Sequence, residues 1–308
     1  MRLLHLLVLL ALLPAAAAGS SAAPARPEVL VSNEDDGSLT VLAADGGASR
    51  LLPLGPRPHN IALAGRDTLL VALQGTRAIA VVNLVTRRVR RIPLGAVPHD
   101  VAGSADGRRA FILSSEGILI LADLSTGGVI RRVTLGGRPH DLAAVGDQLW
   151  ITDTGARTVA LVGARTARLA GRVALPAPGH DLAATPGGGE LWITPWTGNT
   201  VTVVQPRTRR IIARIRVGRS PQHLAFTPDG REAWITETVT GRVYAVDVKL
   251  RRPVAAVRVG GSPHHVAADA RRAYVATSPT SLVAIDIGRR TVVARMAAGA
   301  NPHDVVVR

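Results

Sequence analysis

The sequence predicts an all-β protein: a seven-bladed β-propeller of four-stranded antiparallel blades, closed by a C-terminal strand that completes the first blade. Three observations predict this fold. A short corner motif recurs seven times at near-constant spacing, each interval holds four short segments of β-strand character, and the chain ends on the kind of segment that opens each repeat. Repeats of about 40 residues with four strands each are typical of propeller blades.

The corner motif is a Pro-His pair or a close variant of it. Its second residue falls at positions 59, 99, 140, 180, 222, 264 and 303, so successive corners lie 39 to 42 residues apart. Three consecutive corners depart from the pattern: a glycine replaces the proline before His180, the histidine moves one place in Gln222-His223, and it is doubled in His264-His265. If a ligand lies off the ring axis, we expect it near these blades; the alternative is variation without a function.

Each repeat contains four strand segments in a fixed order. An alternating apolar segment follows the corner, as in residues 142–144, and a tight Asp-Gly turn such as 106–107 leads to a second strand such as 149–152. A loop rich in Gly, Thr and Ser leads to a third strand (200–204), and a basic turn leads to a fourth (211–217). β-Branched residues dominate and no helical period is present, which favours strands throughout.

The two ends of the chain predict how the ring closes. The chain stops after a first-strand segment at residues 302–308, and its first β-type segment, residues 28–32, aligns with a second strand. This offset leaves no unpaired terminal blade, whereas an open array would need capping repeats. We therefore expect the C-terminal strand to complete blade one, and residues 28–308 to form one domain.

The N-terminal segment predicts export. Arg2 is followed by an apolar run at residues 3–13 and by alanines at 15–18, which is the pattern of a secretory signal peptide. The run is shorter than the roughly 20 residues of a membrane-spanning helix, and an uncleaved membrane anchor is the alternative. We expect residues 1–18 to be a signal peptide and 19–27 a linker. The mature chain, without a transmembrane span, is then secreted, periplasmic or at the cell surface.

Composition excludes several classes of protein. The chain has no cysteine, which excludes a disulfide scaffold, a zinc module with cysteine ligands, a thiol enzyme and a lipoprotein anchored through an N-terminal cysteine. The 47% hydrophobic content excludes a disordered chain. The net charge of +15 comes almost entirely from arginine, since Lys249 is the only lysine, and it is compatible with an acidic partner.

The repeats resemble those of the YVTN (YncE-like) β-propeller family. The motifs that carry the resemblance recur through residues 28–308 and are clearest in Gly218-Arg219-Ser220-Pro221, Thr227-Pro228-Asp229-Gly230, Trp234-Ile235-Thr236 and Tyr244-Ala245-Val246-Asp247. The departures are the Trp-Ile-Thr form of the second strand and the histidine at six corners of seven. The resemblance implies an exported or surface-exposed seven-bladed ring, in a family whose members have been linked to nucleic-acid binding and to cell-surface layers.

Every histidine after residue 18 lies at or beside a corner, where the first strands of a propeller line its central channel. Imidazole is the commonest metal ligand, so these side chains could hold a transition metal, a haem or an anionic ligand. The corners also resemble the Pro-His corners of nitrous oxide reductase, whose propeller carries a copper cluster, and Glu237 resembles a residue of the virginiamycin B lyase propellers. The candidate ligand-binding residues at the channel mouth are His59, His99, His140, His180, Gln222, His223, His264, His265, His303, Asp153 and Glu237.

The sequence favours a structural role for the histidines over ligand binding. Alternation along the strand predicts His140 on one face with Leu142 and Ala144, and Asp141 on the other face. A residue that recurs in most blades is expected to meet a need that all blades share, such as a hydrogen bond from the corner to the neighbouring blade. The sequence identifies no catalytic residue and no cofactor, and it leaves open a transition metal at the histidines.

Arginines gather in the turns before the fourth strands and on those strands. This places them on the rim and on the face opposite the corners. Basic side chains at a sheet edge prevent edge-to-edge aggregation, and they would also bind a polyanion through phosphate contacts. The candidate polyanion-binding residues are Arg87, Arg88, Arg90, Arg91, Arg207, Arg209, Arg210, Arg251 and Arg252.

Together these features predict an exported, non-catalytic propeller that acts as a ligand-binding or protein-interaction scaffold at the cell envelope. Its partner would be a protein, a glycan or a small ligand that the sequence does not identify. Two alternatives stay open. One is a metal- or cofactor-dependent enzyme, a lyase, hydrolase or redox propeller, that uses the histidine-rich mouth. The other is a propeller that binds DNA or another polyanion, or an envelope surface, through its arginine rim.

Overall fold

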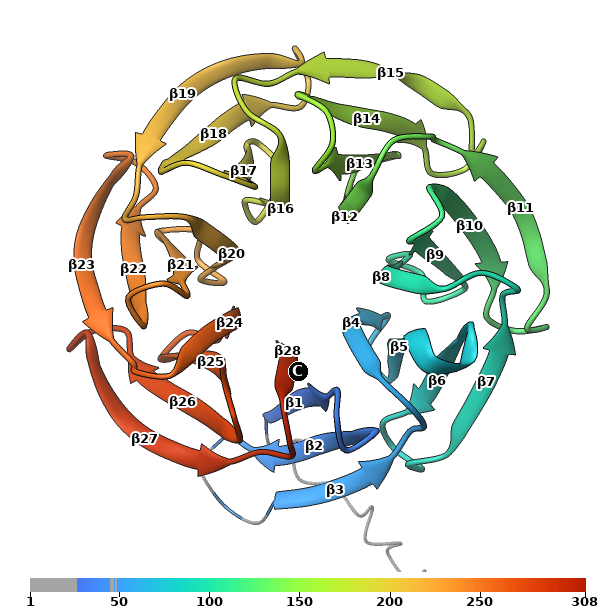
Figure 1. Ribbon diagram of the computed structural model, residues 1–308, viewed down its shortest axis with the longest axis horizontal. Coiled ribbons are helices and arrows are strands. Elements are labelled where there is room, and N and C mark those ends of the chain that lie inside the picture. The colour runs from blue at the N-terminus through green and yellow to red at the C-terminus, as the bar shows by residue number, and fades with distance from the viewer. Residues whose placement is uncertain (1–26, 45–46, 48) are drawn as a thin grey trace, which may run out of the picture.

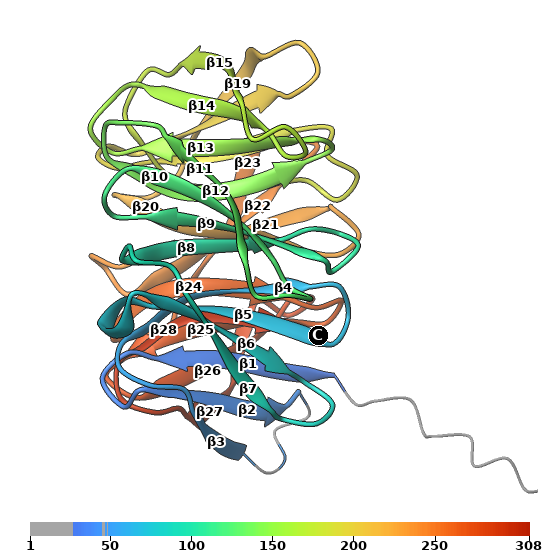
Figure 2. The same cartoon turned by 90° about the vertical axis from the view of Figure 1, so that its right-hand side faces the viewer.

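A computed structural model describes residues 27–44, 47 and 49–308. Regular structure in this part of the chain is β-strand, apart from one short 3-10 helix, η1 (Gln74–Thr76). The strands form seven separate four-stranded antiparallel sheets, arranged as blades around a central axis (Figure 1). Figure 2 shows the same ring from its side. The predicted seven-bladed propeller is confirmed.

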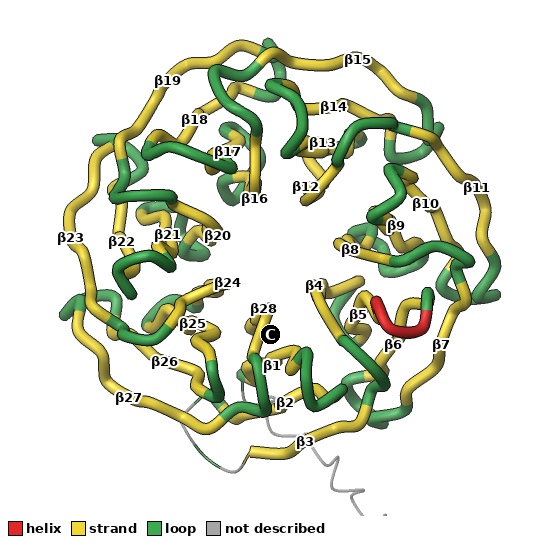
Figure 3. Tube along the Cα trace, in the orientation of Figure 1, coloured by secondary structure: helices red, strands yellow, loops and turns green. Residues whose placement is uncertain are grey.

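Each blade runs from an inner strand at the channel to a fourth strand at the rim (Figure 3). Blade one contains β28 (Pro302–Val307), β1 (Glu28–Asn33), β2 (Ser38–Ala43) and β3 (Ser49–Pro53). Blade two contains β4 (Pro58–Ala64), β5 (Thr68–Leu73), β6 (Ala78–Asn83) and β7 (Val89–Pro93). Blade three contains β8 (Pro98–Gly103), β9 (Arg109–Ser114), β10 (Ile118–Asp123) and β11 (Val129–Thr134).

Blade four contains β12 (Pro139–Val145), β13 (Gln148–Asp153), β14 (Thr158–Gly163) and β15 (Leu169–Ala174). Blade five contains β16 (Gly179–Ala184), β17 (Leu191–Pro195), β18 (Thr200–Gln205) and β19 (Arg210–Arg216). Blade six contains β20 (Pro221–Phe226), β21 (Glu232–Glu237), β22 (Arg242–Asp247) and β23 (Arg252–Arg258). Blade seven contains β24 (Ser262–Ala268), β25 (Arg272–Ser278), β26 (Ser281–Asp286) and β27 (Thr291–Ala297).

The C-terminal strand closes the ring. In Figure 1, β28 lies between the inner strands β24 and β4, next to β1. It pairs antiparallel with β1, with Val307 opposite Val29 and Val306 opposite Leu30. The Arg308 N–H donates to the Glu28 carbonyl at 2.9 Å, and the Glu28 N–H donates back at 3.0 Å. The predicted closure of blade one by the end of the chain is confirmed.

The apolar core lies between neighbouring blades, because each sheet packs its faces against the sheets on either side. Second and third strands are buried almost throughout, whereas fourth strands are largely exposed on the rim. Trp150, Trp192, Trp234 and Tyr274 hold the same second-strand position in blades four to seven and are at most 1% exposed. Each packs into the apolar cluster shared with the following blade, so these aromatic rings fill the blade interfaces.

Arginines on the fourth strands connect neighbouring blades. Each donates to the carbonyl oxygen of the residue that ends the preceding blade. The pairs are Arg91 with Leu54 at 2.5 Å, Arg132 with Leu94, Arg172 with Leu135 at 2.8 Å, and Arg295 with Val259 at 2.6 Å. Guanidinium groups therefore pair blades around the rim, in addition to the predicted protection of its edges.

Some of the candidate polyanion-binding arginines make hydrogen bonds or ion pairs within the protein. Besides Arg91, Arg90 donates to the Leu124 carbonyl at 2.5 Å, Arg87 pairs with Glu28, and Arg251 pairs with Glu190 at 2.7 Å. Polyanion binding stays a prediction. The arginines that remain exposed for it are Arg88, Arg207, Arg209, Arg210 and Arg252.

We expect Arg132→Ala to lower the free energy of unfolding by about 1–3 kcal/mol, because the Leu94 carbonyl loses a charged donor that links blades two and three. The matched control is Arg131→Ala on the same strand, where the side chain is exposed and a change within about 0.5 kcal/mol is expected. Urea denaturation measures both. Equal effects of the two substitutions would contradict the link between blades.

No helix in residues 27–44, 47 and 49–308 is long and apolar enough to cross a membrane. The predicted signal peptide, and the predicted linker apart from Pro27, lie outside the described residues. Export therefore stays a prediction from the sequence.

Candidate metal centre at the channel mouth

Each inner strand carries a β-bulge at its corner. In blade four, His140 and Asp141 together lie opposite the single residue Thr152, and the register shifts at the same place in the other six blades. A bulge changes the direction in which side chains project. The side chains of His140 and Asp141 meet, with Nδ1 3.1 Å from Oδ2. The prediction that alternation separates them onto opposite faces is therefore wrong.

A hydroxyl on the second strand holds the bulge. In blade four the Asp141 N–H donates to Thr152 Oγ1 at 3.0 Å, and that hydroxyl donates to the His180 carbonyl of the next blade at 2.6 Å. Ser32 in blade one and Thr194 in blade five make the equivalent pair of bonds. Thr152 and Thr194 of the Trp-Ile-Thr strands thus fix the corner and connect it to the next blade, whereas Thr236 in blade six holds only its own corner, at His223.

Seven imidazoles form a closed ring at the channel mouth, which we call the histidine ring: His59, His99, His140, His180, His223, His264 and His303. The centroids of adjacent rings are 3.7 to 4.8 Å apart all the way round. His223 completes the ring although Gln222 holds the corner position of blade six. His265 stacks on His223, with centroids 3.5 Å apart. The structure thus brings all eight candidate histidines together.

The residue after each corner residue occupies what we call the second position, and three aspartates there hold pairs of blades together. Asp304 accepts the N–H of Val305 in its own blade and of Ile61 in the next blade, both at 2.7 Å. Asp100 and Asp181 make the equivalent pairs of bonds. These carboxylates serve blades one and two, three and four, and five and six. An odd number of blades cannot be paired completely, and blade seven is left out.

The other four second positions carry Asn60, Asp141, His223 and His265, and they make contacts within the channel. Asn60 Nδ2 donates to Asp141 Oδ1 at 3.2 Å, a contact between blades two and four. His265 Nδ1 lies 2.9 Å from Asp304 Oδ1. Side chains from non-adjacent blades meet here, so these four residues point toward the axis of the ring.

Several imidazole nitrogens are buried without a hydrogen-bond partner. They are Nδ1 of His303, Nε2 of His265 and both ring nitrogens of His223. The imidazoles of His99 and His264 are directed at the backbone of the neighbouring corner, at His140 and His303. The predicted corner hydrogen bond, from imidazole to the neighbouring blade, is present at His59 and His180, whose Nδ1 atoms lie 3.1 and 3.3 Å from carbonyl oxygens there. Buried polar atoms without partners are costly, so these nitrogens are available to a metal ion, a polar ligand or ordered water.

Most of the histidines are neutral at pH 7. Burial, reinforced by neighbouring imidazoles, lowers the pKa of His264 to about 3 and holds the pKa values of His59, His223 and His303 well below 6.5. Burial likewise lowers the pKa of His99 and of His180 to about 4, although Asp141 opposes it. A neutral imidazole has a lone pair available for a metal ion, so the ring is ready to coordinate one.

Two histidines are exceptions because each lies beside a carboxylate. Burial alone would lower the pKa of His265, but the Asp304 carboxylate outweighs it and raises that pKa to about 9. Asp141 outweighs burial in the same way and raises the pKa of His140. For Asp141 itself, burial would raise the pKa, but His140, His180 and His99 hold it well below its usual range. Asp141 is therefore an ionised carboxylate among imidazoles.

The pKa values of two other aspartates at the mouth, Asp100 and Asp181, shift the opposite way. Burial, with Asp141 nearby, raises the pKa of Asp181 to about 7 and that of Asp100 well above its usual range. Asp141 thus carries negative charge at the mouth without bridging two blades through backbone N–H groups, whereas Asp304, the carboxylate beside His265, does bridge two blades.

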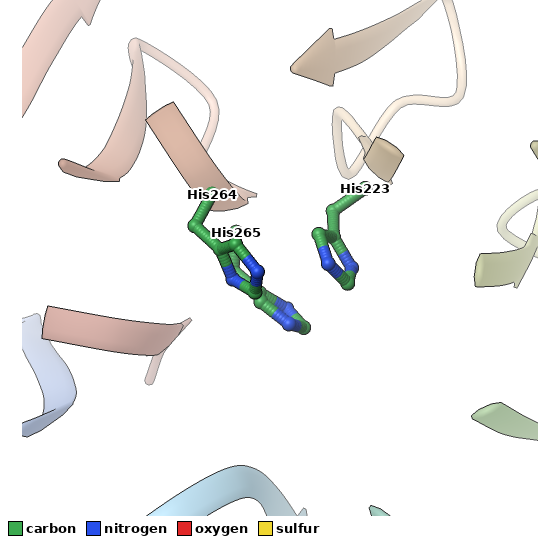
Figure 4. Close-up of side chains that lie close together, drawn as sticks. All are labelled: His223, His264 and His265. Carbon is green, nitrogen blue, oxygen red and sulfur yellow. The ribbon is translucent and has the colours of Figure 1, made fainter. Parts of the chain in front are cut away.

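Three sets of side chains place potential metal-ligating atoms within 4.8 Å of one another. The sets are His223, His264 and His265; Asp141, His180 and His223; and His99, His140 and Asp141. Figure 4 shows the first set, with His223 facing His264 and His265 from the neighbouring blade. Imidazole with one carboxylate suits zinc, copper, iron or nickel ions.

The remaining candidate residues from the sequence serve the loops around the mouth. Asp153 accepts the Arg138 N–H at 3.1 Å, and Glu237 accepts the Arg219 N–H at 2.9 Å. The Gln222 side chain accepts the Thr238 hydroxyl at 2.8 Å. The structure does not bring these three side chains into the metal-ligating sets, and ligand binding by them stays a prediction.

Two residues of the mouth were not among the predicted site residues. One is Asp141, whose signal in the sequence is an acidic residue directly after the corner in four of the seven blades. The other is Trp196, which is 45% exposed and lies with its ring centroid 5.1 Å from that of His180 and 5.5 Å from that of His140. Trp196 therefore covers part of the histidine ring and reports on its surroundings.

Many solved structures have a similar fold, and three of them are described here. Hydrazine synthase of Kuenenia stuttgartiensis matches with a TM-score of 0.71 and 16% identity over 81% of this chain and 89% of that chain. Dihydro-heme d1 dehydrogenase NirN matches with a TM-score of 0.70 and 15% identity over 89% of this chain and 66% of that chain. A functionally unknown protein of Desulfotomaculum acetoxidans matches with a TM-score of 0.80 and 11% identity over 91% of this chain and 98% of that chain.

These identities show the propeller fold alone. No family model and no curated protein matches the sequence. The resemblance to the YVTN (YncE-like) family is thus supported at the level of the seven-bladed fold, and membership of that family stays a prediction.

Proposed function

We propose that the protein is an exported propeller that binds a transition-metal ion at its histidine ring. The observation that carries the proposal is the convergence of neutral, buried imidazoles whose nitrogens have no hydrogen-bond partner. A metal ion would take up these lone pairs, and Asp141 would supply negative charge for a divalent cation. The N-terminal sequence supports export.

A purely structural role for the histidines has less support than the sequence indicated. The links between neighbouring corners come mainly from Asp100, Asp181 and Asp304 and from the second-strand hydroxyls. If the imidazoles were structural as well, their nitrogens should be paired, yet both nitrogens of His223 are buried without a partner. Metal binding gives these nitrogens a partner.

The proposal assigns binding and leaves the chemistry of a bound ion open. Hydrazine synthase and NirN are enzymes by their names, so the same fold supports catalysis in other proteins. Among the described residues at the channel mouth, the side chains that come together are potential metal ligands. Binding of a metal ion is therefore the activity that the geometry supports best.

The test measures the metal directly. The protein is purified without a chelator and without a histidine tag, and its metal content is determined by elemental analysis. We expect at least one transition-metal ion per chain, and loss of that ion from a variant in which His180, His223 and His264 are all replaced by alanine. Metal-free protein that stays so after incubation with Cu²⁺, Zn²⁺ and Ni²⁺ in turn would refute the proposal.

Trp196 provides a second readout in solution. Its ring contacts those of His140 and His180, whereas Trp150, Trp192 and Trp234 are buried between blades. We expect Cu²⁺ to quench the Trp196 part of the fluorescence until the site is full. In Trp196→Phe, copper should still bind by elemental analysis while most of the quenching disappears. Equal quenching in Trp196→Phe and the unchanged protein would place the metal elsewhere.

A further inference from the structure

We propose that the histidine ring holds two metal ions bridged by the imidazolate of His223. The inference rests on the proposed function and deepens it, since it gives the number of ions and their ligands. One ion would take His223, His264 and His265, and the other would take Asp141, His180 and His223. His223 is the residue common to the two sets.

The first argument is the state of the two His223 nitrogens. Both are buried and neither has a hydrogen-bond partner, and the residue is 2% exposed. Nδ1 lies 3.6 Å from Asp181 Oδ2, which is beyond hydrogen-bond distance. Two other histidines of these sets, His180 and His265, do not share this feature. His180 has its Nδ1 at a carbonyl oxygen and His265 has its Nδ1 at Asp304. The Nε2 atom of each ring is therefore the one left to bind a metal ion.

The second argument is the position of His223 in the fold. It occupies the second position of blade six, where blades one, three, four and five have aspartate. Its N–H is held by Thr236 Oγ1 at 3.0 Å, as the Asp141 N–H is held by Thr152, so the backbone of the bulge is unchanged. An imidazole therefore stands where other blades place a carboxylate. It lies between His265 on one side and His180 on the other, with ring centroids at 3.5 and 4.8 Å.

The third argument is charge. Two divalent ions in a buried channel need anionic ligands. Asp141 supplies one negative charge, and His223 supplies another when it binds metal through both nitrogens. In that step the remaining N–H proton of His223 is released to solvent, two nitrogen–metal bonds form, and no electron is transferred. His265 binds through the lone pair of its Nε2, because Asp304 holds the other nitrogen of that ring.

The test is loading with Cu²⁺ followed by elemental analysis and electron paramagnetic resonance. We expect two copper ions per chain and a resonance signal far below two spins, because an imidazolate bridge couples the two ions. His264→Ala should bind one copper with a signal of about one spin, and so should Asp141→Asn, since each removes a ligand from a different ion. Asp35→Asn is the matched control for Asp141→Asn. Asp35 is an exposed aspartate outside both sets and outside the histidine ring, and this variant should keep two coupled ions.

The outcomes separate this inference from the proposed function. No copper in the unchanged protein would remove both. One copper per chain with a full one-spin signal would leave the proposed function standing and overturn the bridged pair. Two copper ions with a two-spin signal would likewise overturn the bridge. His223→Ala tests the bridge itself: any copper that it retains must give its full signal, and a coupled pair in that variant would overturn the assignment.

Discussion

Deletion of residues 302–308 is expected to abolish the cooperative thermal unfolding of the protein. Without β28, blade one loses its inner strand, and β1 is left with an unpaired edge facing the channel. Burial of Val305 is worth about 1.5–3 kcal/mol. Loss of the Asp304 carboxylate adds about 3–5 kcal/mol. The sum is comparable with the whole stability of a typical domain, about 5–15 kcal/mol.

Circular dichroism during heating measures this effect. The control is the truncated protein with a synthetic peptide of residues 302–308 added in excess. Because the peptide can occupy the vacant inner-strand position, it should restore a cooperative transition at high concentration. A truncated protein that melts at the same temperature as the full chain would contradict closure of the ring by β28.

The sequence predicts the fold well because every blade repeats the same solution. Spacing, turn residues and β-branched segments each point to four strands per unit, and the phase of residues 302–308 predicts the closure. These are local or periodic properties, which a single chain displays directly. The structure agrees with them down to the inner strands that begin at the corners, from Pro58 in blade two to Pro302 in blade one.

The candidate site is predicted only in part, because it depends on the bulge. Alternation predicts His140 and Asp141 on opposite faces, whereas the bulge opposite Thr152 brings them together. The sequence therefore indicates a ring of histidines and misses the carboxylate among them. It also presents Gln222-His223 as a displaced corner. The structure shows instead that His223 occupies the second position, from which its side chain completes the histidine ring between His180 and His264.

The different contacts of the second-position aspartates likewise depend on which blades are linked in pairs in the folded protein. Asp100, Asp141, Asp181 and Asp304 look equivalent in the sequence, since each follows a corner histidine. In the structure three of them bind backbone N–H groups of two blades, and Asp141 instead contacts His140 and Asn60. Seven blades cannot be divided into pairs, and three of the four second-position residues left over from this pairing, Asp141, His223 and His265, belong to the candidate metal-ligating sets.

Replacement of Asp304 by alanine is expected to lower the free energy of unfolding of the metal-free protein by about 3–5 kcal/mol. The carboxylate accepts two buried N–H groups, those of Ile61 and Val305, and it lies 2.9 Å from Nδ1 of His265. Alanine leaves both donors without an acceptor and removes the anionic partner of a buried imidazole. Each loss carries a desolvation cost that water cannot offset at a site only 7% exposed.

Urea denaturation of the metal-free protein measures this loss, and two further variants define its cause. Asp304→Asn keeps one oxygen acceptor but turns an amide N–H₂ toward the second backbone donor, so an intermediate loss is expected. Asp35→Ala is the matched control, because Asp35 is an exposed aspartate of the same face and should change stability by no more than about 0.5 kcal/mol. If Asp304→Ala were as mild as Asp35→Ala, the carboxylate would not hold blades one and two together. The three paired aspartates would then be as free to bind metal as Asp141, and the argument that singles out Asp141 as the anionic ligand would fail with it.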